Sequence, residues 1–98
     1  MNFLVQGYDG TDDKAYERRQ NARDGHLENM KKLRENKQIL FAVAMLNSEG
    51  KMCGSTMIME FANRTELDAW LEKEPYVTGK VWEKVEIVEC QVPPAFLK

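Results

Sequence analysis

The sequence has little proline, few cysteines and no long apolar run. Three prolines among 98 residues leave room for long regular elements. The two cysteines, Cys53 and Cys90, belong to no C-x-x-C pair, so their spacing indicates neither a zinc site nor a redox motif, and we expect reduced core thiols. The apolar run at the amino terminus is too short for a signal peptide, and no stretch approaches the length of a membrane span. We therefore expect a cytoplasmic protein with no membrane partner.

Charge of one sign is not in excess either. The formal net charge is −2, and lysine and arginine are interspersed with acidic residues, which argues against a nucleic-acid partner. Glycine-rich phosphate loops, serine-nucleophile elbows and metal-ligand clusters are absent, so we expect neither a cofactor nor a metal site. A hydrophobic content of 43% with 31% charged residues is typical of a globular chain, and the length fits a single domain over residues 1–98.

Alternating periodicities predict four strands and two helices. The strands are expected over residues 3–8, 38–46, 53–61 and 81–92, and a long helix over 13–36, in which Gly25 is a point where the helix can bend or stop. A shorter helix begins at Asn63 or Thr65 and should stop near Lys73 or Glu74, because Pro75 cannot continue it. Residues 93–98 are expected to form an extended tail.

The order βαββαβ predicts an α+β, ferredoxin-like fold, with a four-stranded antiparallel sheet and two helices on one face. Only the face under the helices should then be apolar, yet the strand over 38–46 is hydrophobic on both sides. We expect Ile39, Phe41, Val43 and Met45 to point one way, and Leu40, Ala42, Ala44 and Leu46 the other. An exposed apolar sheet face is rare in a monomer, so we expect a homodimer packed sheet to sheet.

Three basic side chains fall within the apolar arc of the long helix. On a helical wheel, Arg19, Arg23 and His26 share the arc of Ala15, Tyr16, Ala22, Leu27, Met30 and Leu33. Cationic groups that face a sheet are costly unless they are paired or line a cavity, and a pocket explains this set better than a filled core. For Arg19 by itself, we favour a stem that covers apolar surface with its head in water.

His26 is the only histidine, and histidine is the side chain best suited to exchange protons near neutral pH. A packed, hydrogen-bonded core histidine explains the same residue equally well. The segment Glu74-Pro75-Tyr76 has two interpretations as well. It is a helix stop with an aromatic anchor, or it fixes a carboxylate that holds an imidazole in one tautomer. Whether His26 and Glu74 meet is not visible in the sequence.

With Arg23-Asp24-Gly25-His26-Leu27, Gly54-Ser55 and Glu74-Pro75-Tyr76-Val77, the chain resembles the YciI-like (YCII-related) family over nearly its whole length. The family pattern is R-x-x-H on the first helix and a later acidic-Pro-Tyr or acidic-Pro-Phe. The resemblance implies a dimeric α/β barrel, with His26 as catalytic acid or base and the acidic residue as its partner. This chain carries Glu74 where the family usually has aspartate, which moves the carboxylate by one carbon–carbon bond.

Our leading hypothesis is a cofactor-free enzyme that eliminates or isomerises a small anionic substrate. The predicted catalytic residues are His26 and Glu74, and the predicted substrate-binding residues are Arg19, Arg23, Ser55 and Tyr76. In a second hypothesis, a ligand-binding or sensor domain uses the same residues to hold a small anion without chemistry. In a third, the chain is an oligomeric accessory module, which predicts that His26 and Arg23 are packed with no cavity.

Overall fold

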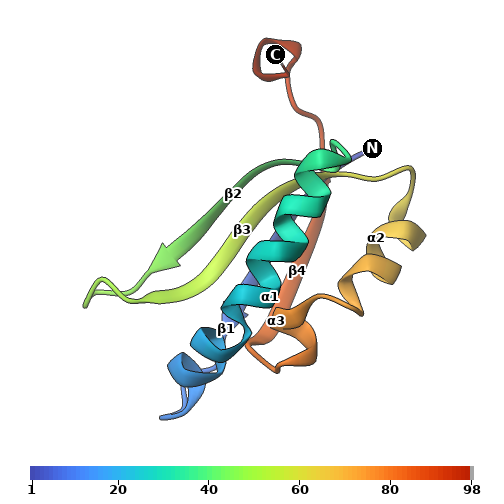
Figure 1. The fold of residues 1–98 in the computed structure, drawn as a ribbon. Helices are drawn as coiled ribbons and strands as arrows, with labels where there is room; N and C mark the ends of the chain where they lie inside the picture. The colour runs from blue at the N-terminus through green and yellow to red at the C-terminus, as the bar shows by residue number, and fades with distance from the viewer. Residues whose placement is uncertain (98) are drawn as a thin grey trace.

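A computed structural model describes residues 1–97, in which helices pack on one face of an antiparallel sheet (Figure 1). The elements follow in the order β1 (Asn2–Asp9), α1 (Ala15–Glu35), β2 (Ile39–Leu46), β3 (Met52–Glu60), α2 (Arg64–Leu71), α3 (Pro75–Thr78), β4 (Trp82–Cys90) and the 3₁₀ turn η1 (Pro94–Phe96). The strands lie side by side in the order β2-β3-β1-β4, and each neighbouring pair is antiparallel. The ferredoxin-like α+β fold is therefore confirmed.

The core lies between the helices and one face of the sheet. Every second residue of the central strand β1 is buried, as expected for a strand with one covered face. Phe3 and Val5 of β1 pair with Met59 and Met57 of β3, and all four side chains are buried. Leu67 of α2 completes this cluster from the helix side. Helix α2 begins as predicted, because the Asn63 side chain accepts a hydrogen bond from the backbone N–H of Glu66 at 2.9 Å.

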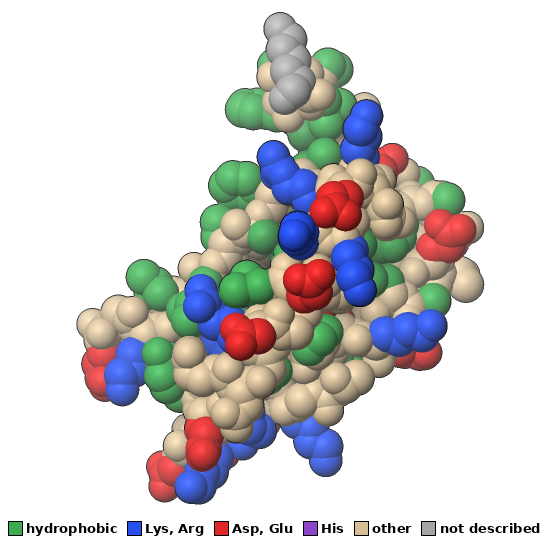
Figure 2. All heavy atoms as spheres, in the orientation of Figure 1, with side chains coloured by type: hydrophobic (Ala, Val, Ile, Leu, Met, Phe, Trp, Pro, Cys, Tyr) green, Lys and Arg blue, Asp and Glu red, His purple; other side chains and the backbone are tan. Residues whose placement is uncertain are grey.

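The predicted facing of β2 is wrong at Ile39 and at Leu40. Leu40 was expected opposite Phe41, but the two residues line one pocket together with Leu4 and Ile58. Ile39 was expected on the same face as Phe41, but the register shifts between them, and Ile39 pairs with the buried Met59. Phe41 pairs with Ile58 on the opposite face and is 61% exposed. A bulge turns a side chain to the other face of the sheet. The position of a bulge cannot be predicted from an uninterrupted apolar run, because both faces are apolar there. Figure 2 shows hydrophobic side chains along the side of the molecule where β2 lies, and charges of both signs elsewhere.

A short helix, α3, follows α2 and was not predicted. Helix α2 ends at Leu71, slightly before the expected stop, and Pro75 then starts a new turn of helix. Proline suits the first helical position, because its fixed φ is helical and its missing N–H would have no intrahelical partner. The Glu74 side chain caps this turn by accepting from the backbone N–H of Tyr76 at 3.4 Å. The segment interpreted as a simple helix stop is thus a structured element that fixes Glu74.

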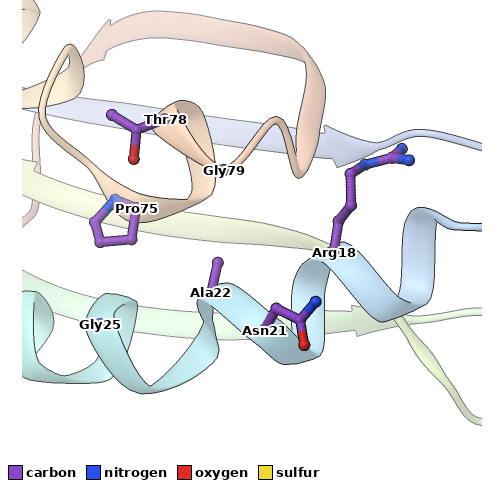
Figure 3. A pocket seen from close by; sticks show the side chains of 7 residues that line it. All are labelled: Arg18, Asn21, Ala22, Gly25, Pro75, Thr78 and Gly79. Carbon is purple, nitrogen blue, oxygen red and sulfur yellow. The ribbon is translucent and has the colours of Figure 1, made fainter.

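Gly25 allows α3 to lie close to α1. The helix runs without a break through Gly25, so the bend or stop considered there does not occur. A Cβ atom built at Gly25 would lie 3.3 Å from Cγ of Pro75, tighter than an ordinary contact. Figure 3 shows Gly25 and Ala22 of α1 opposite Pro75 and Gly79, around a shallow hollow. The small residue therefore brings the start of α3, and with it Glu74, against α1.

The expected extended tail is wrong in part, because Pro94–Phe96 forms a single 3₁₀ turn. Lys98, the last residue of that predicted tail, lies outside the described residues. Among residues 1–97, no helix combines the length and the hydrophobicity needed to cross a membrane.

Candidate active site

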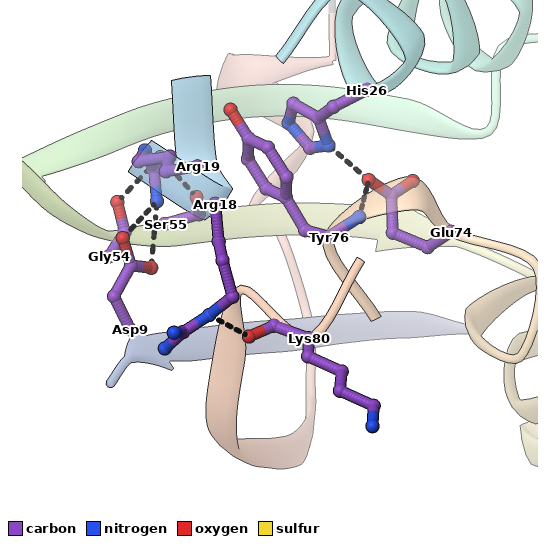
Figure 4. Close-up of polar contacts among 9 residues, drawn as sticks. All are labelled: Asp9, Arg18, Arg19, His26, Gly54, Ser55, Glu74, Tyr76 and Lys80. Atoms are coloured by element: carbon purple, nitrogen blue, oxygen red, sulfur yellow. Dashed lines mark hydrogen bonds and ion pairs between the residues drawn. The ribbon is translucent and has the colours of Figure 1, made fainter. Parts of the chain in front are cut away.

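His26 of α1 and Glu74 at the start of α3 are in direct contact. Nδ1 of His26 is hydrogen-bonded to Oε1 of Glu74, and both side chains are buried (Figure 4). Asn29 Nδ2 donates to the second oxygen, Oε2, at 2.6 Å. Which atom of this pair donates depends on the imidazole tautomer. With Glu74 as a carboxylate acceptor, the proton is on Nδ1 and the lone pair is on Nε2, for which no hydrogen bond is found among residues 1–97.

Aromatic rings fix the plane of the imidazole. The Tyr76 ring stacks on His26 with 3.8 Å between centroids and 10° between planes. The Trp82 indole meets the imidazole edge to face, with centroids 6.0 Å apart. Trp82 can occupy this place because residue 7 is a glycine and has no side chain. A Cβ atom at Gly7 would lie only 2.3 Å from the indole ring. Burial raises the pKa of Tyr76, so its phenol is neutral at physiological pH and can donate a hydrogen bond.

Arg19 is buried, and the expectation that its head group lies in water is wrong. The side chain is 2% exposed, and Nη1 donates to both carboxylate oxygens of Asp9, at 2.8 and 3.1 Å. Nη2 donates to the carbonyl of Gly54 at 3.1 Å and to Oγ of Ser55 at 2.9 Å (Figure 4). Burial raises the pKa of Asp9, and the Arg19 charge acts in the opposite direction. The guanidinium carbon also lies 4.6 Å from the centroid of the Tyr76 ring.

A cavity of about 260 Å³ lies between α1 and the strands β2 and β3. Its polar lining consists of Arg19, Arg23, His26, Ser55 and Tyr76; its apolar lining consists of Leu27, Met30, Ala42, Val43, Ala44, Met52 and Met57. A cavity of roughly 150 Å³ can hold a benzene ring, so this one has room for one ring with substituents. The structure contradicts the third hypothesis, because His26 and Arg23 line an open cavity.

The structure thus brings together all six predicted site residues, which differ in their burial and in their position relative to the cavity. His26, Tyr76, Arg19 and Ser55 are buried, whereas Arg23 is exposed at the edge of the cavity. Glu74 does not line the cavity and lies behind the imidazole. Tyr16 and Leu27, placed on the buried arc of α1, are 41% and 47% exposed, so the buried stripe of this helix is narrower than predicted.

Sequence reasoning missed Asn29, Asp9 and Trp82. Asn29 could have been found from its spacing, because residues three apart on a helix lie on the same face and His26 was already a candidate. Asp9 ends strand β1 next to the long helix and was not among the predicted site residues. We find no sequence signal that places Trp82 against the imidazole. Among residues 1–97, no three side chains of His, Cys, Asp or Glu gather as metal ligands.

Comparison with known proteins gives a family match and a structural match. The family model of the YCII-related domain matches residues 1–91. The chain is 30% identical over 93 residues to Protein YciI of Escherichia coli O6:H1 and to Protein YciI of Shigella flexneri; each alignment covers 89% of this chain and 93% of the relative. A solved structure of 5-chloro-2-hydroxyhydroquinone dehydrochlorinase (TftG) from Burkholderia phenoliruptrix AC1100, in complex with 2,5-dihydroxybenzoquinone, has a TM-score of 0.85. It is 19% identical, and the match covers 97% of this chain and 98% of that one.

Proposed function

Since this chain belongs to the YCII-related family and buries its one histidine beside a cavity, we propose that it is a proton-transfer enzyme for small anions. The supporting observation is the buried hydrogen bond between Nδ1 of His26 and Oε1 of Glu74, to which we assign the polarity that follows. Glu74 takes the Nδ1 proton as its hydrogen-bond partner, which leaves the Nε2 lone pair for a ligand. Histidine in this state is a general base with no need of a cofactor.

In the proposed reaction, Nε2 of His26 removes a proton from the bound substrate. The imidazolium that forms is stabilised by the Glu74 carboxylate, whose other oxygen is held by Asn29. His26 then returns the proton to a different atom of the same molecule, which is an isomerisation, or releases it to water after an anion has left the substrate, which completes an elimination. In both cases the enzyme ends in its starting protonation state.

Arg23 is the side chain that we propose to bind the substrate anion. Arg19 donates four hydrogen bonds to protein atoms. We therefore propose that it acts on a bound anion through its positive charge and not through a direct hydrogen bond. No hydrogen bond or ion pair among residues 1–97 engages Arg23, which leaves its guanidinium for a carboxylate, phenolate or enolate. The hydroxyl groups of Tyr76 and Ser55 supply neutral polar contacts on the cavity wall.

The similar fold of the dehydrochlorinase favours elimination from a hydroxylated ring as one reaction to test. That protein is named for a chlorinated hydroxyhydroquinone and was solved with a dihydroxybenzoquinone. Both compounds are single rings with acidic hydroxyl groups, a size that the cavity of about 260 Å³ admits. We propose substrates of this general kind: one ring or a short unsaturated chain that carries a negative oxygen.

Deuterium exchange tests the proposal without knowledge of the net reaction. A panel of small hydroxyarenes, including 5-chloro-2-hydroxyhydroquinone, and of unsaturated carboxylates is incubated with the protein in D₂O and followed by NMR. We expect deuterium uptake or product formation with at least one compound, a large loss in His26→Gln, and a loss in Glu74→Gln. Glu72→Gln is the matched control, because Glu72 is an exposed glutamate two residues away.

The exchange result separates this proposal from the binding hypothesis. Compounds that bind but never exchange a proton would favour a sensor domain and contradict the proposed enzyme. Full exchange in His26→Gln would show that another group is the base.

We also propose that the chain acts as a homodimer packed through the open faces of its two sheets. Phe41 and Val88 on that face are 61% and 54% exposed, and Leu4 and Ile58 lie between them. Burial of such a face against a second copy removes this apolar area from water. Light scattering at micromolar concentration should give twice the monomer mass, and Phe41→Glu should give the monomer mass. A monomeric wild type would contradict the homodimer.

A further inference from the structure

Among residues 1–97, the second oxygen of Glu74 has one hydrogen-bond donor, and that donor is Asn29. We propose that Asn29 is a positioning residue for the candidate catalytic pair. It keeps Glu74 a hydrogen-bond acceptor toward Nδ1 of His26. The proton of the imidazole then stays on Nδ1, and Nε2, the nitrogen toward the cavity, carries none. This inference rests on the proposed function, because it concerns the state of the same imidazole.

The geometry supports a specific role for Asn29. Glu74 is fully buried, so water does not solvate its carboxylate, and donors from the protein must take the place of water. In the part of the chain that the structure describes, three donors are present: Nδ1 of His26 and the backbone N–H of Tyr76 at Oε1, and Nδ2 of Asn29 at Oε2. The contact to Tyr76 is long, at 3.4 Å, whereas the contact to Asn29 is short, at 2.6 Å. Asn29 is therefore the strongest support that the carboxylate has besides the imidazole.

Loss of the Asn29 donor should reverse the hydrogen bond between Glu74 and His26. A buried carboxylate with fewer donors is favoured to bind a proton itself. A protonated Glu74 would donate to Nδ1, and the neutral imidazole would then carry its own proton on Nε2. In that arrangement the nitrogen toward the cavity has no lone pair, so the base is lost although His26 and Glu74 are both still present.

The single histidine makes this state directly measurable. Protein labelled with ¹⁵N-histidine gives the signals of one imidazole only, and long-range ¹H–¹⁵N spectra distinguish the Nδ1–H tautomer from the Nε2–H tautomer. The test compares wild type with Asn29→Leu, which keeps a similar volume and removes the donor. Asn21→Leu is the matched control, since Asn21 is an exposed asparagine on the same helix. Asn29→Ala serves as a second variant if the leucine disturbs folding.

We expect the Nδ1–H tautomer in wild type and in Asn21→Leu. In Asn29→Leu, the ratio of the Nδ1–H to the Nε2–H form should fall at least about tenfold. A tenfold change corresponds to about 1.4 kcal/mol, which lies near the range for one hydrogen bond to a charged group. A purely structural role for Asn29 would lower the melting temperature and leave this ratio unchanged.

The outcomes distinguish failure of this inference from failure of the proposed function. If wild type shows Nδ1–H and Asn29→Leu shows the same ratio, Asn29 does not position the pair, and the proposed base remains. If wild type itself carries its proton on Nε2, then the proposed base is contradicted together with the role of Asn29.

Discussion

Removal of the Arg19 guanidinium, as in Arg19→Met, should destabilise the protein far more than loss of a surface arginine. The side chain is 2% exposed, and the carboxylate of Asp9 that it pairs with is 4% exposed. The substitution breaks four hydrogen bonds and leaves Asp9 buried without its counter-charge. Breaking a buried ion pair on one side costs about 3 to 5 kcal/mol, whereas a surface pair contributes about 1 kcal/mol or less. We expect a loss near 4 kcal/mol, or a fall in Tm of roughly 20 °C.

Urea unfolding of the single and double variants measures this cost. Asp9→Asn added to Arg19→Met should restore at least about 1 kcal/mol, because it removes the unpaired charge. The single variant should also recover stability at low pH. Burial raises the pKa of Asp9 in the folded protein above its value in the unfolded chain. The contribution of Asp9 to folding stability is therefore complete below the unfolded-state pKa, and it is lost as the pH rises through the folded-state pKa. Loss of Arg19 removes the charge that opposes this shift. A cost below about 1 kcal/mol, unchanged by pH or by Asp9→Asn, would refute the buried ion pair.

Three further changes test the cavity and its surroundings. Arg23→Gln should weaken binding of an anionic ligand about tenfold or more in calorimetry, whereas Arg34→Gln, at an exposed position of the same helix, should not; equal affinities would remove Arg23 from the site. Ala44→Leu places an isobutyl group in the cavity and should abolish ligand binding with little change in Tm; retained binding would place the ligand elsewhere. Burial raises the pKa of Tyr76, so folding stability is lost as the pH rises through that raised value; Tyr76→Phe should lose less stability between pH 9 and pH 11, and an equal loss would contradict the buried phenol.

The sequence predicted the order and types of the main elements, because apolar periodicity and turn residues are local signals. It did not predict α3, since the signals around Pro75 describe a helix stop and a helix start equally well. Nor did it predict that Ile39 faces the helices. The register shift before Phe41 depends on how β2 pairs with β3. An uninterrupted apolar run has the same sequence pattern whether or not a bulge is present.

The site was predicted in its residue types and less well in its contacts. His26 and Glu74 meet because Gly25 lets Pro75 approach α1, a tertiary relation between segments that are far apart in the chain. The placement of Arg19 failed for a similar reason. Without a known counter-charge, an arginine on a helix is predicted to lie at the surface. Asp9 becomes the partner of Arg19 only when β1 and α1 pack together.

A crystal structure with 2,5-dihydroxybenzoquinone, the compound bound by the structurally similar dehydrochlorinase, tests the central claim most directly. We predict one ring in the cavity between α1 and β2, with an acidic oxygen or carbon about 3 Å from Nε2 of His26 and a charged oxygen beside Arg23. The imidazole should keep its Nδ1 contact to Glu74 in the complex. A ligand bound on the open sheet face, or an Nε2 bonded to a protein group with the cavity closed, would contradict the account.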